Sequence, residues 1–219
     1  MKGLFKVRGR GYAIAVATLA ALSMMVTAAS AGVTTETEDV FGQGMTGPVV
    51  SPGGATLQRS DSGLSVKLTM PTPEPGSYFY PGTDQPPGGL VPPATGPVGF
   101  PPAVPGHPEA YSLWMFVFNA PGECAGDPCT IADFSRLAPT SAGAFNAGGH
   151  LVGGQNLQLS GRVTLSSAPF AGQSLTNPHG SEVHLAVAPH GALDPALLPD
   201  MINLPIGNPA YWWLAIFEQ

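Results

Sequence analysis

The sequence predicts an all-β protein: an antiparallel β-sandwich with a long Pro/Gly-rich insertion and one short helix. Charged residues make up only 10% of the 219 residues, whereas there are 29 Gly and 25 Pro, which favours a turn-rich β protein over a helical bundle. Short apolar or alternating segments recur between the turn residues, and no long segment repeats its apolar residues every 3.6 positions. Many short strands of this kind are typical of a sandwich.

The first 31 residues have the layout of a secretory signal peptide. Four basic residues lie within the first ten positions, an uncharged apolar run covers residues 11–28, and the small residues 29–31 precede Gly32. We therefore expect cleavage after Ala31 and a secreted or periplasmic protein, in a compartment where disulfides persist. The apolar run is short of the roughly 20 residues of a membrane span, and later apolar runs are shorter, so we expect no transmembrane segment after signal removal.

We expect an irregular N-terminal segment over residues 32–53 and one β-sandwich domain over residues 54–219. The domain opens with a hairpin over residues 55–70 that turns at residues 61–63. In the second strand of this hairpin, apolar side chains share one face and polar side chains the other. The apolar residues are Leu64, Val66, Leu68 and Met70, and the polar residues are Ser65, Lys67 and Thr69.

Residues 71–108 form the Pro/Gly-rich insertion, with a proline every few positions. Because proline donates no backbone hydrogen bond, this segment is excluded from an interior strand or a helix and is expected to be extended or polyproline-like. A loop this long in a compact domain either packs over the surface through its aromatic residues or is mobile. A third hypothesis is that the insertion binds a partner.

The remaining elements follow in order. Residues 111–118 are almost wholly apolar and aromatic, which predicts a central strand buried on both faces, and residues 131–137 suit a short turn of helix. Three more strand-like segments, 142–152, 156–165 and 181–188, are each bounded by Gly, Pro or Asn.

The one short helix is predicted after these strands. Asp194 is its expected N-cap and Pro195 its first residue, and Pro199 and Pro205 keep it short. Residues 211–217 are expected to form a closing strand.

Two cysteines, Cys124 and Cys129, lie in the exported part of the chain and predict a local disulfide. A loop this short removes little chain entropy, so the bond is expected to shape the loop more than it stabilises the fold. The spacing is not Cys-x-x-Cys, which disfavours a redox pair, and a cysteine-based zinc site would need ligands from elsewhere.

The charge of the exported chain restricts its partners. Removal of the signal leaves four Lys and Arg against fourteen Asp and Glu, a net charge near −10. Nucleic-acid binding requires basic residues to neutralise phosphates, so we expect no nucleic acid and no anionic membrane surface as a partner. A cation, a glycan or other neutral polymer, or a protein partner is compatible with this charge.

One constellation has the residue types of a metal site. Glu182 and His184 would project from the same face of a strand about 7 Å apart. His190 stands at the end of that strand and His150 on a neighbouring predicted strand. Such a set suits zinc or copper, and Glu182 with His184 could act in general acid–base catalysis. Histidines on sheet faces are more often packing residues, so no cofactor is the default expectation and no residue is assigned a catalytic role.

Trp212 and Trp213 suggest a carbohydrate-binding module if their rings are exposed and coplanar, although aromatic residues in apolar strands more often belong to a core. The chain has no Gly-x-Ser-x-Gly elbow, phosphate loop or dinucleotide fingerprint. The leading hypothesis is therefore a non-enzymatic binding or structural module, with a metal-binding protein or enzyme and a carbohydrate-binding module as alternatives.

Two groups of motifs carry a resemblance. The strand Tyr111-Ser112-Leu113-Trp114 leads into the two-cysteine loop, and Ala147-Gly148-Gly149-His150 is followed by Ser181-Glu182-Val183-His184-Leu185. Together they resemble a group of uncharacterised secreted bacterial proteins with a Tyr-Thr-Leu-Trp-Trp strand, a two-cysteine loop and a Glu-x-His-Leu strand. The order of elements is also similar to the CHRD domain, a β-sandwich module with a His-x-His-Gly signature, where this chain has Glu182-Val183-His184. The resemblance implies export and a sandwich and brings no established activity.

Overall fold

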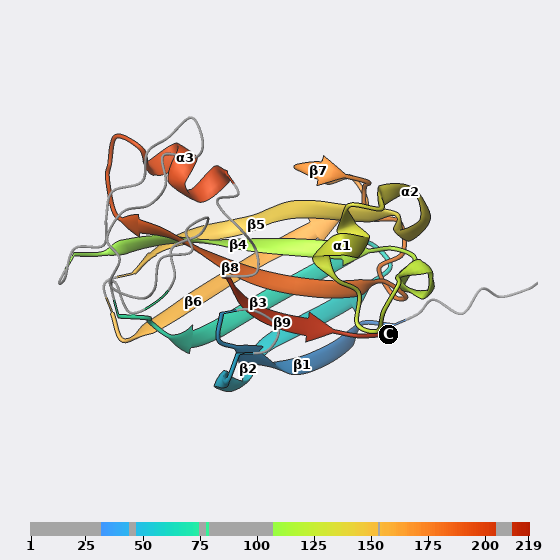
Figure 1. The fold of residues 1–219 in the computed structure, drawn as a ribbon, viewed down its shortest axis with the longest axis horizontal. Coiled ribbons are helices and arrows are strands. Elements are labelled where there is room, and N and C mark those ends of the chain that lie inside the picture. The colour runs from blue at the N-terminus through green and yellow to red at the C-terminus, as the bar shows by residue number, and fades with distance from the viewer. Residues whose placement is uncertain (1–31, 44–46, 75–77, 79–106, 153, 205–211) are drawn as a thin grey trace, which may run out of the picture. The chain divides into compact units, whose positions relative to one another are not determined.

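The computed structural model describes most of the chain that follows the predicted signal peptide (Figure 1). The described residues are 32–43, 47–74, 78, 107–152, 154–204 and 212–219. For residues 150–152 only the backbone is described. The predicted signal peptide, residues 75–77 and 79–106 of the predicted Pro/Gly-rich insertion, and residue 211 at the start of the predicted strand 211–217 lie outside them. Expectations about the order of the insertion and about the cleavage site therefore stay predictions.

In the described part of the chain, nine strands form one open sheet in the order β6-β3-β2-β1-β9-β8-β4-β5-β7, and every neighbouring pair is antiparallel. The strands are β1 (Thr34–Phe41), β2 (Val49–Ser60), β3 (Gly63–Pro71), β4 (Glu109–Phe118), β5 (Ala142–Val152), β6 (Asn156–Thr164), β7 (Ala171–Gly172), β8 (Glu182–Ala192) and β9 (Trp213–Phe217). The helical elements are η1 (Pro121–Glu123), α1 (Ile131–Phe134), α2 (Leu137–Thr140) and α3 (Leu198–Asn203).

The sheet folds over so that β6, β3, β2 and β1 lie against β8, β4 and β5 as two layers (Figure 1). Apolar side chains from both layers form one core between them, which confirms the predicted β-sandwich. This core includes Leu57, Leu64, Val66, Leu68, Leu113, Met115, Val117, Leu159, Val183, Leu185 and Val187.

The two layers approach each other closely on both sides of the core. On one side, β1 pairs with β9 through Phe41 and Leu214. On the other side β5 crosses β6, and a Cβ atom at Gly161 would collide with the carbonyl oxygen of Ala147. Glycine is therefore required at position 161 by the close approach of two backbones.

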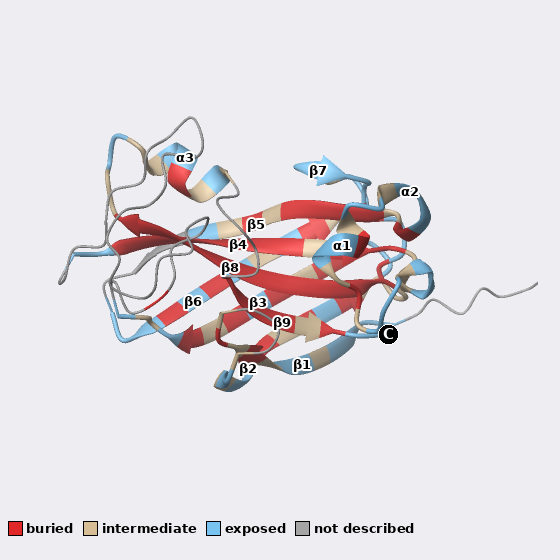
Figure 2. Ribbon diagram, in the orientation of Figure 1, coloured by how far each residue is buried: buried red, intermediate tan, exposed pale blue. Residues whose placement is uncertain are grey.

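Strands β4 and β8 are buried on both faces, as predicted for residues 111–118 (Figure 2). Their outer face carries two further apolar clusters, which α1, α2 and the cysteine loop help to cover. One cluster contains Trp114, Ala186, Ala188, Trp212 and Leu214, and the other contains Phe118, Cys129 and Ala142.

The hairpin prediction is confirmed, whereas the predicted irregular segment over residues 32–53 is wrong. β2 and β3 pair from Ala55–Leu68 to Ser60–Gly63. Residues 34–41 form β1, and β2 already begins at Val49. Most β1 side chains are exposed or half-buried, so its apolar pattern is weak, and the strand is held by backbone pairing with β2 on one side and β9 on the other.

Helix content and the end of β8 also differ from the prediction. Among the described residues, α1 confirms the predicted turn of helix over residues 131–137, and α2 is a further short helix that was not predicted. The helix expected from Asp194 begins only at Leu198, because the Asp194 carboxylate accepts a 2.9 Å hydrogen bond from the Ala196 N–H and stabilises a turn instead. Pro199 stands in the first turn of α3, where its missing N–H costs nothing. β8 continues past Pro189 to Ala192 through a register shift opposite Glu109 and Tyr111.

Candidate functional site

The structure brings Glu182 and His184 together on the outer face of β8. His184 Nε2 lies 2.5 Å from Glu182 Oε1, and the same oxygen accepts a 2.7 Å hydrogen bond from the Cys129 N–H. Both residues are buried, and the His184 ring packs 5.1 Å from the ring of Phe118. The pair thus anchors the cysteine loop on the sheet.

His190 does not join this pair. It lies six residues further along β8, roughly 20 Å away at the rise of a strand. Its Nε2 is 2.6 Å from Ser112 Oγ, which also accepts a hydrogen bond from Trp114 Nε1. Burial lowers the pKa of His190 to about 3, so the ring is neutral at physiological pH. Ser112 and His190 have the separation of a nucleophile and its base, but they are 0% and 1% exposed.

His150 lies on β5 opposite Tyr111, whereas His184 lies opposite Phe116 on the same central strand. The predicted convergence of His150, Glu182, His184 and His190 is therefore wrong, because the extension of β8 past Pro189 carries His190 away from His184. Among the described residues, no group of three His, Cys, Asp or Glu side chains could hold one metal ion. Glu182 and His184 lie close enough to each other to share an ion.

The predicted stacking platform is also wrong. Trp212 is 1% exposed and packs in the outer cluster, with its ring 6.5 Å from Trp114 and 6.2 Å from Phe116. Trp213 is 5% exposed and belongs to the core between the layers. Trp212 directly precedes β9, and the two rings lie on opposite faces of the sheet, so they do not form one stacking surface.

The predicted disulfide joins Cys124 to Cys129. The loop is held by the Asp133 carboxylate, which accepts hydrogen bonds from the N–H groups of Ala125 and Thr130 and from the Thr130 hydroxyl. These contacts lower the pKa of Asp133, with the Ala125 N–H as the largest cause. The loop is thus built by a buried carboxylate as well as by the covalent bond.

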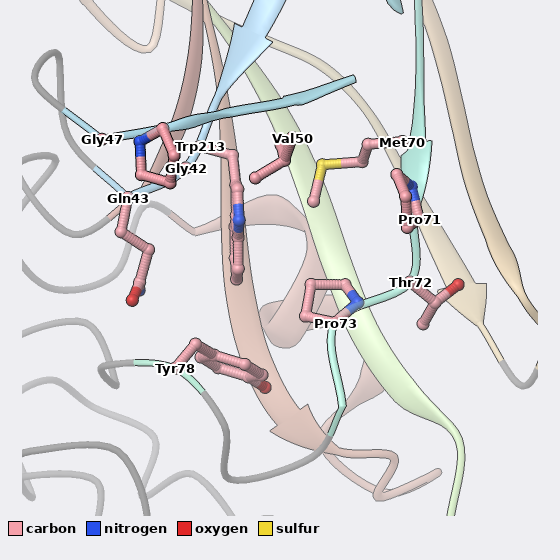
Figure 3. A pocket seen from close by; sticks show the side chains of 11 residues that line it. Gly42, Gln43, Gly47, Val50, Met70, Pro71, Thr72, Pro73, Tyr78 and Trp213 are labelled. Atoms are coloured by element: carbon pink, nitrogen blue, oxygen red, sulfur yellow. The ribbon is translucent and has the colours of Figure 1, made fainter. Parts of the chain in front are cut away.

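A pocket of about 370 Å³ opens where the ends of β1, β2, β3 and β9 meet (Figure 3). Trp213 and Tyr78 border one side of it, and Val50, Met70 and Pro73 lie across from them. Both aromatic rings are held in the core edge-on, with centroids 5.2 Å apart at 71°. The described lining residues include no charged side chain.

A buried carboxylate stands behind this aromatic wall. Glu109 is 2% exposed, and its Oε2 accepts hydrogen bonds of 2.5 Å from the Tyr78 hydroxyl and 2.7 Å from the Tyr111 hydroxyl. Burial raises the pKa of Glu109, and the two tyrosine hydroxyls oppose that shift. Its other oxygen, Oε1, is buried with no hydrogen-bond partner among the described residues.

Sequence reasoning missed this group. A signal was present, since Glu109 is an acidic residue two positions before the run 111–118, which was predicted to be buried on both faces, and the strand extends to include it. A carboxylate in that position needs partners. Its partner Tyr78 lies 31 residues earlier in the insertion, and neither residue belongs to a recognisable motif.

Comparisons with protein-family models, curated proteins and solved structures found no match to this chain. The resemblance to uncharacterised secreted proteins and to the CHRD domain therefore stays a prediction. None of the helices among the described residues has the length and apolar character to cross a membrane.

Proposed function

We propose that the protein is an exported, non-enzymatic binding module that holds a small ligand in the pocket between Trp213 and Tyr78. The observation that carries this proposal is the pocket itself. Its volume of about 370 Å³ falls within the range of small-ligand sites, and its lining is mostly aromatic and aliphatic, with Gln43 and Thr72 as polar side chains. The signal-peptide layout and the disulfide support export.

The pocket walls are positioned before any ligand arrives. Trp213 is fixed by the pairing of β9 with β8, where it lies opposite Val187. Tyr78 is fixed by its hydrogen bond to Glu109 and by its ring contact with Trp213. A ligand that enters such a site orders few side chains, so more of its contact energy appears as affinity.

The test uses the mature protein, residues 32–219, labelled with 5-fluorotryptophan. Three fluorine resonances are expected, from Trp114, Trp212 and Trp213, and single Trp→Phe variants assign them. Small probes with apolar faces (indole, cyclohexanol and 3,3-dimethylbutan-1-ol) are titrated separately. Saturable shifts of the Trp213 resonance, with the resonances of Trp114 and Trp212 unmoved, are the expected result.

Trp212 serves as the matched control because it is adjacent in sequence and lies on the other face of the sheet. Should all three resonances move in parallel, the probes bind non-specifically. If no probe moves the Trp213 resonance, the pocket is not a binding site and the proposal is overturned.

A further inference from the structure

We propose that the ligand of this pocket is a small organic cation of the quaternary ammonium class, whose charged group carries no hydrogen-bond donor. This inference rests on the proposed function, because it names the chemistry of the ligand in the same pocket. It is carried by the aromatic wall of Trp213 and Tyr78 together with the carboxylate of Glu109 directly behind that wall.

The first argument is the chemistry of the lining. The faces of Trp and Tyr rings attract cations, and Trp does so most strongly. Proline residues 48, 71 and 73 form part of the remaining wall and have no backbone N–H, while Met70 and Val50 add apolar contact. The polar side chains among the described lining residues are those of Gln43 and Thr72, and both are uncharged. A quaternary ammonium group has no N–H that needs an acceptor, so this largely apolar lining leaves no donor of the charged group unsatisfied.

The second argument is the charge behind the wall. Tyr78 lines the pocket and donates to Glu109 Oε2, so one tyrosine side chain separates the carboxylate from the pocket. Charges interact strongly across a layer that excludes water. Because Glu109 Oε1 is buried without a described partner, a neutral ligand would leave this carboxylate uncompensated, whereas a cation would offset its charge.

The third argument is the charge of the whole chain. The exported part carries four basic residues against fourteen acidic ones, so its field attracts cations and repels anions. None of the four remaining Lys and Arg residues appears among the described residues that line the pocket. Charge complementarity therefore selects a cation over an anion of the same shape.

The test compares three probes of nearly the same shape and different charge. Choline is the cation, 3,3-dimethylbutan-1-ol is its neutral isostere, and 3,3-dimethylbutanoate is the anion. Each is titrated against the fluorotryptophan-labelled mature protein, and the shift of the Trp213 resonance gives its Kd. Choline is expected to bind about tenfold more tightly than the alcohol, and the anion most weakly.

Two variants locate the origin of the charge preference. In Glu109→Gln the amide oxygen still accepts a hydrogen bond while the charge is removed, so the ratio of choline to alcohol affinity is expected to fall to about twofold or less. Glu74→Gln is the matched control, because Glu74 is exposed and follows the lining residue Pro73. Its ratio is expected to equal that of the wild type, and thermal unfolding confirms that both variants fold.

Each alternative result is decisive. Equal affinity for choline and the alcohol overturns the cation proposal and leaves the pocket as a site for neutral ligands. An equal loss of preference in Glu74→Gln and Glu109→Gln assigns the effect to general surface charge and overturns the role of Glu109. Failure of choline to move the Trp213 resonance overturns the cation proposal even if indole or cyclohexanol binds. The wild-type comparison alone suffices if Glu109→Gln fails to fold.

Discussion

Trp212 and Trp213 are consecutive in the chain and pack on opposite faces of the sheet. Trp213 lies in the core between the layers and contacts Tyr78 edge-on, whereas Trp212 packs against Trp114 in the outer cluster. The alternation of a strand produces this separation. Two neighbouring residues of the same type therefore support two different parts of the protein.

The first prediction separates these two roles. Trp213→Leu and Trp212→Leu should each lower the free energy of unfolding by about 2 kcal/mol or more, because each leaves a cavity in a buried cluster. Only Trp213→Leu should also weaken binding of pocket probes. Urea denaturation measures the first effect and probe titration the second. A loss of affinity in Trp212→Leu as large as in Trp213→Leu would contradict the assignment of the pocket.

The second prediction concerns Arg59, a buried cation that joins the two layers. Its Nε and Nη2 donate to the Glu36 carboxylate on β1, and its Nη1 donates to the carbonyls of Pro178 and Ser181 ahead of β8. Arg59→Ala should lower the free energy of unfolding by about 3–5 kcal/mol, since it leaves these acceptors without their donor. Equilibrium denaturation measures the change.

Two further variants check this interpretation. Arg59→Lys should recover little of the loss, because an ammonium group cannot reproduce the guanidinium fork. Arg162→Ala, on the exposed face of β6, should change stability by no more than about 0.5 kcal/mol. Similar effects of Arg59→Ala and Arg162→Ala would show that the buried network contributes little.

The third prediction is the pH dependence of the cysteine loop. Hydrogen bonds lower the pKa of Asp133 below its ordinary value of 3.8, so its contribution to stability is present above that value. The contribution is lost as the pH falls through the lowered pKa of the folded state. The stability difference between wild type and Asp133→Asn should thus be constant near neutral pH and shrink below about pH 4.

Denaturation at a series of pH values measures this difference. Glu123→Gln is the control, because Glu123 is exposed in the same loop. A difference for Asp133→Asn that stays unchanged down to pH 2 would contradict the role of its charge.

The fourth prediction is the pH dependence of cation binding. Burial raises the pKa of Glu109, and among the described residues the titratable groups that contact it are Tyr78 and Tyr111. A bound cation favours the ionised carboxylate, so choline affinity should fall as the pH drops through the raised pKa. Affinity for 3,3-dimethylbutan-1-ol should change little. Choline affinity that is flat from pH 7 to pH 4 would contradict an electrostatic role of Glu109.

Local patterns predicted much of the fold. The alternation in residues 64–70 identified β3, the apolar run 111–118 identified the central strand, and the spacing of Cys124 and Cys129 identified the disulfide. Each of these signals lies within a few consecutive residues. β1 was missed because its side chains are mostly polar and show no apolar alternation. The strand is held instead by backbone pairing with β2 and by the hydrogen bond of Arg59 to Glu36.

The candidate site could not be predicted from local sequence patterns, because its residues are far apart in the chain. The pocket combines the ends of four strands with Tyr78, and its carboxylate comes from Glu109 at the start of β4. Strand periodicity did place Glu182 and His184 on one face, and the structure confirms that juxtaposition. It could not reveal that β8 continues past Pro189, which decides where His190 lies.

The pairing of β1 with β9 has a consequence for the order of folding. β1 and β9 are the first and last strands of the described chain, yet they are neighbours at the middle of the sheet order. The β2–β3 hairpin can form early from residues close in sequence, but the hydrogen-bonded junction of the layers between β1 and β9 requires residues 213–217. Such long-range closure is slow. We expect a late kinetic phase in which the shielding of Trp213 and the joining of the layers occur together.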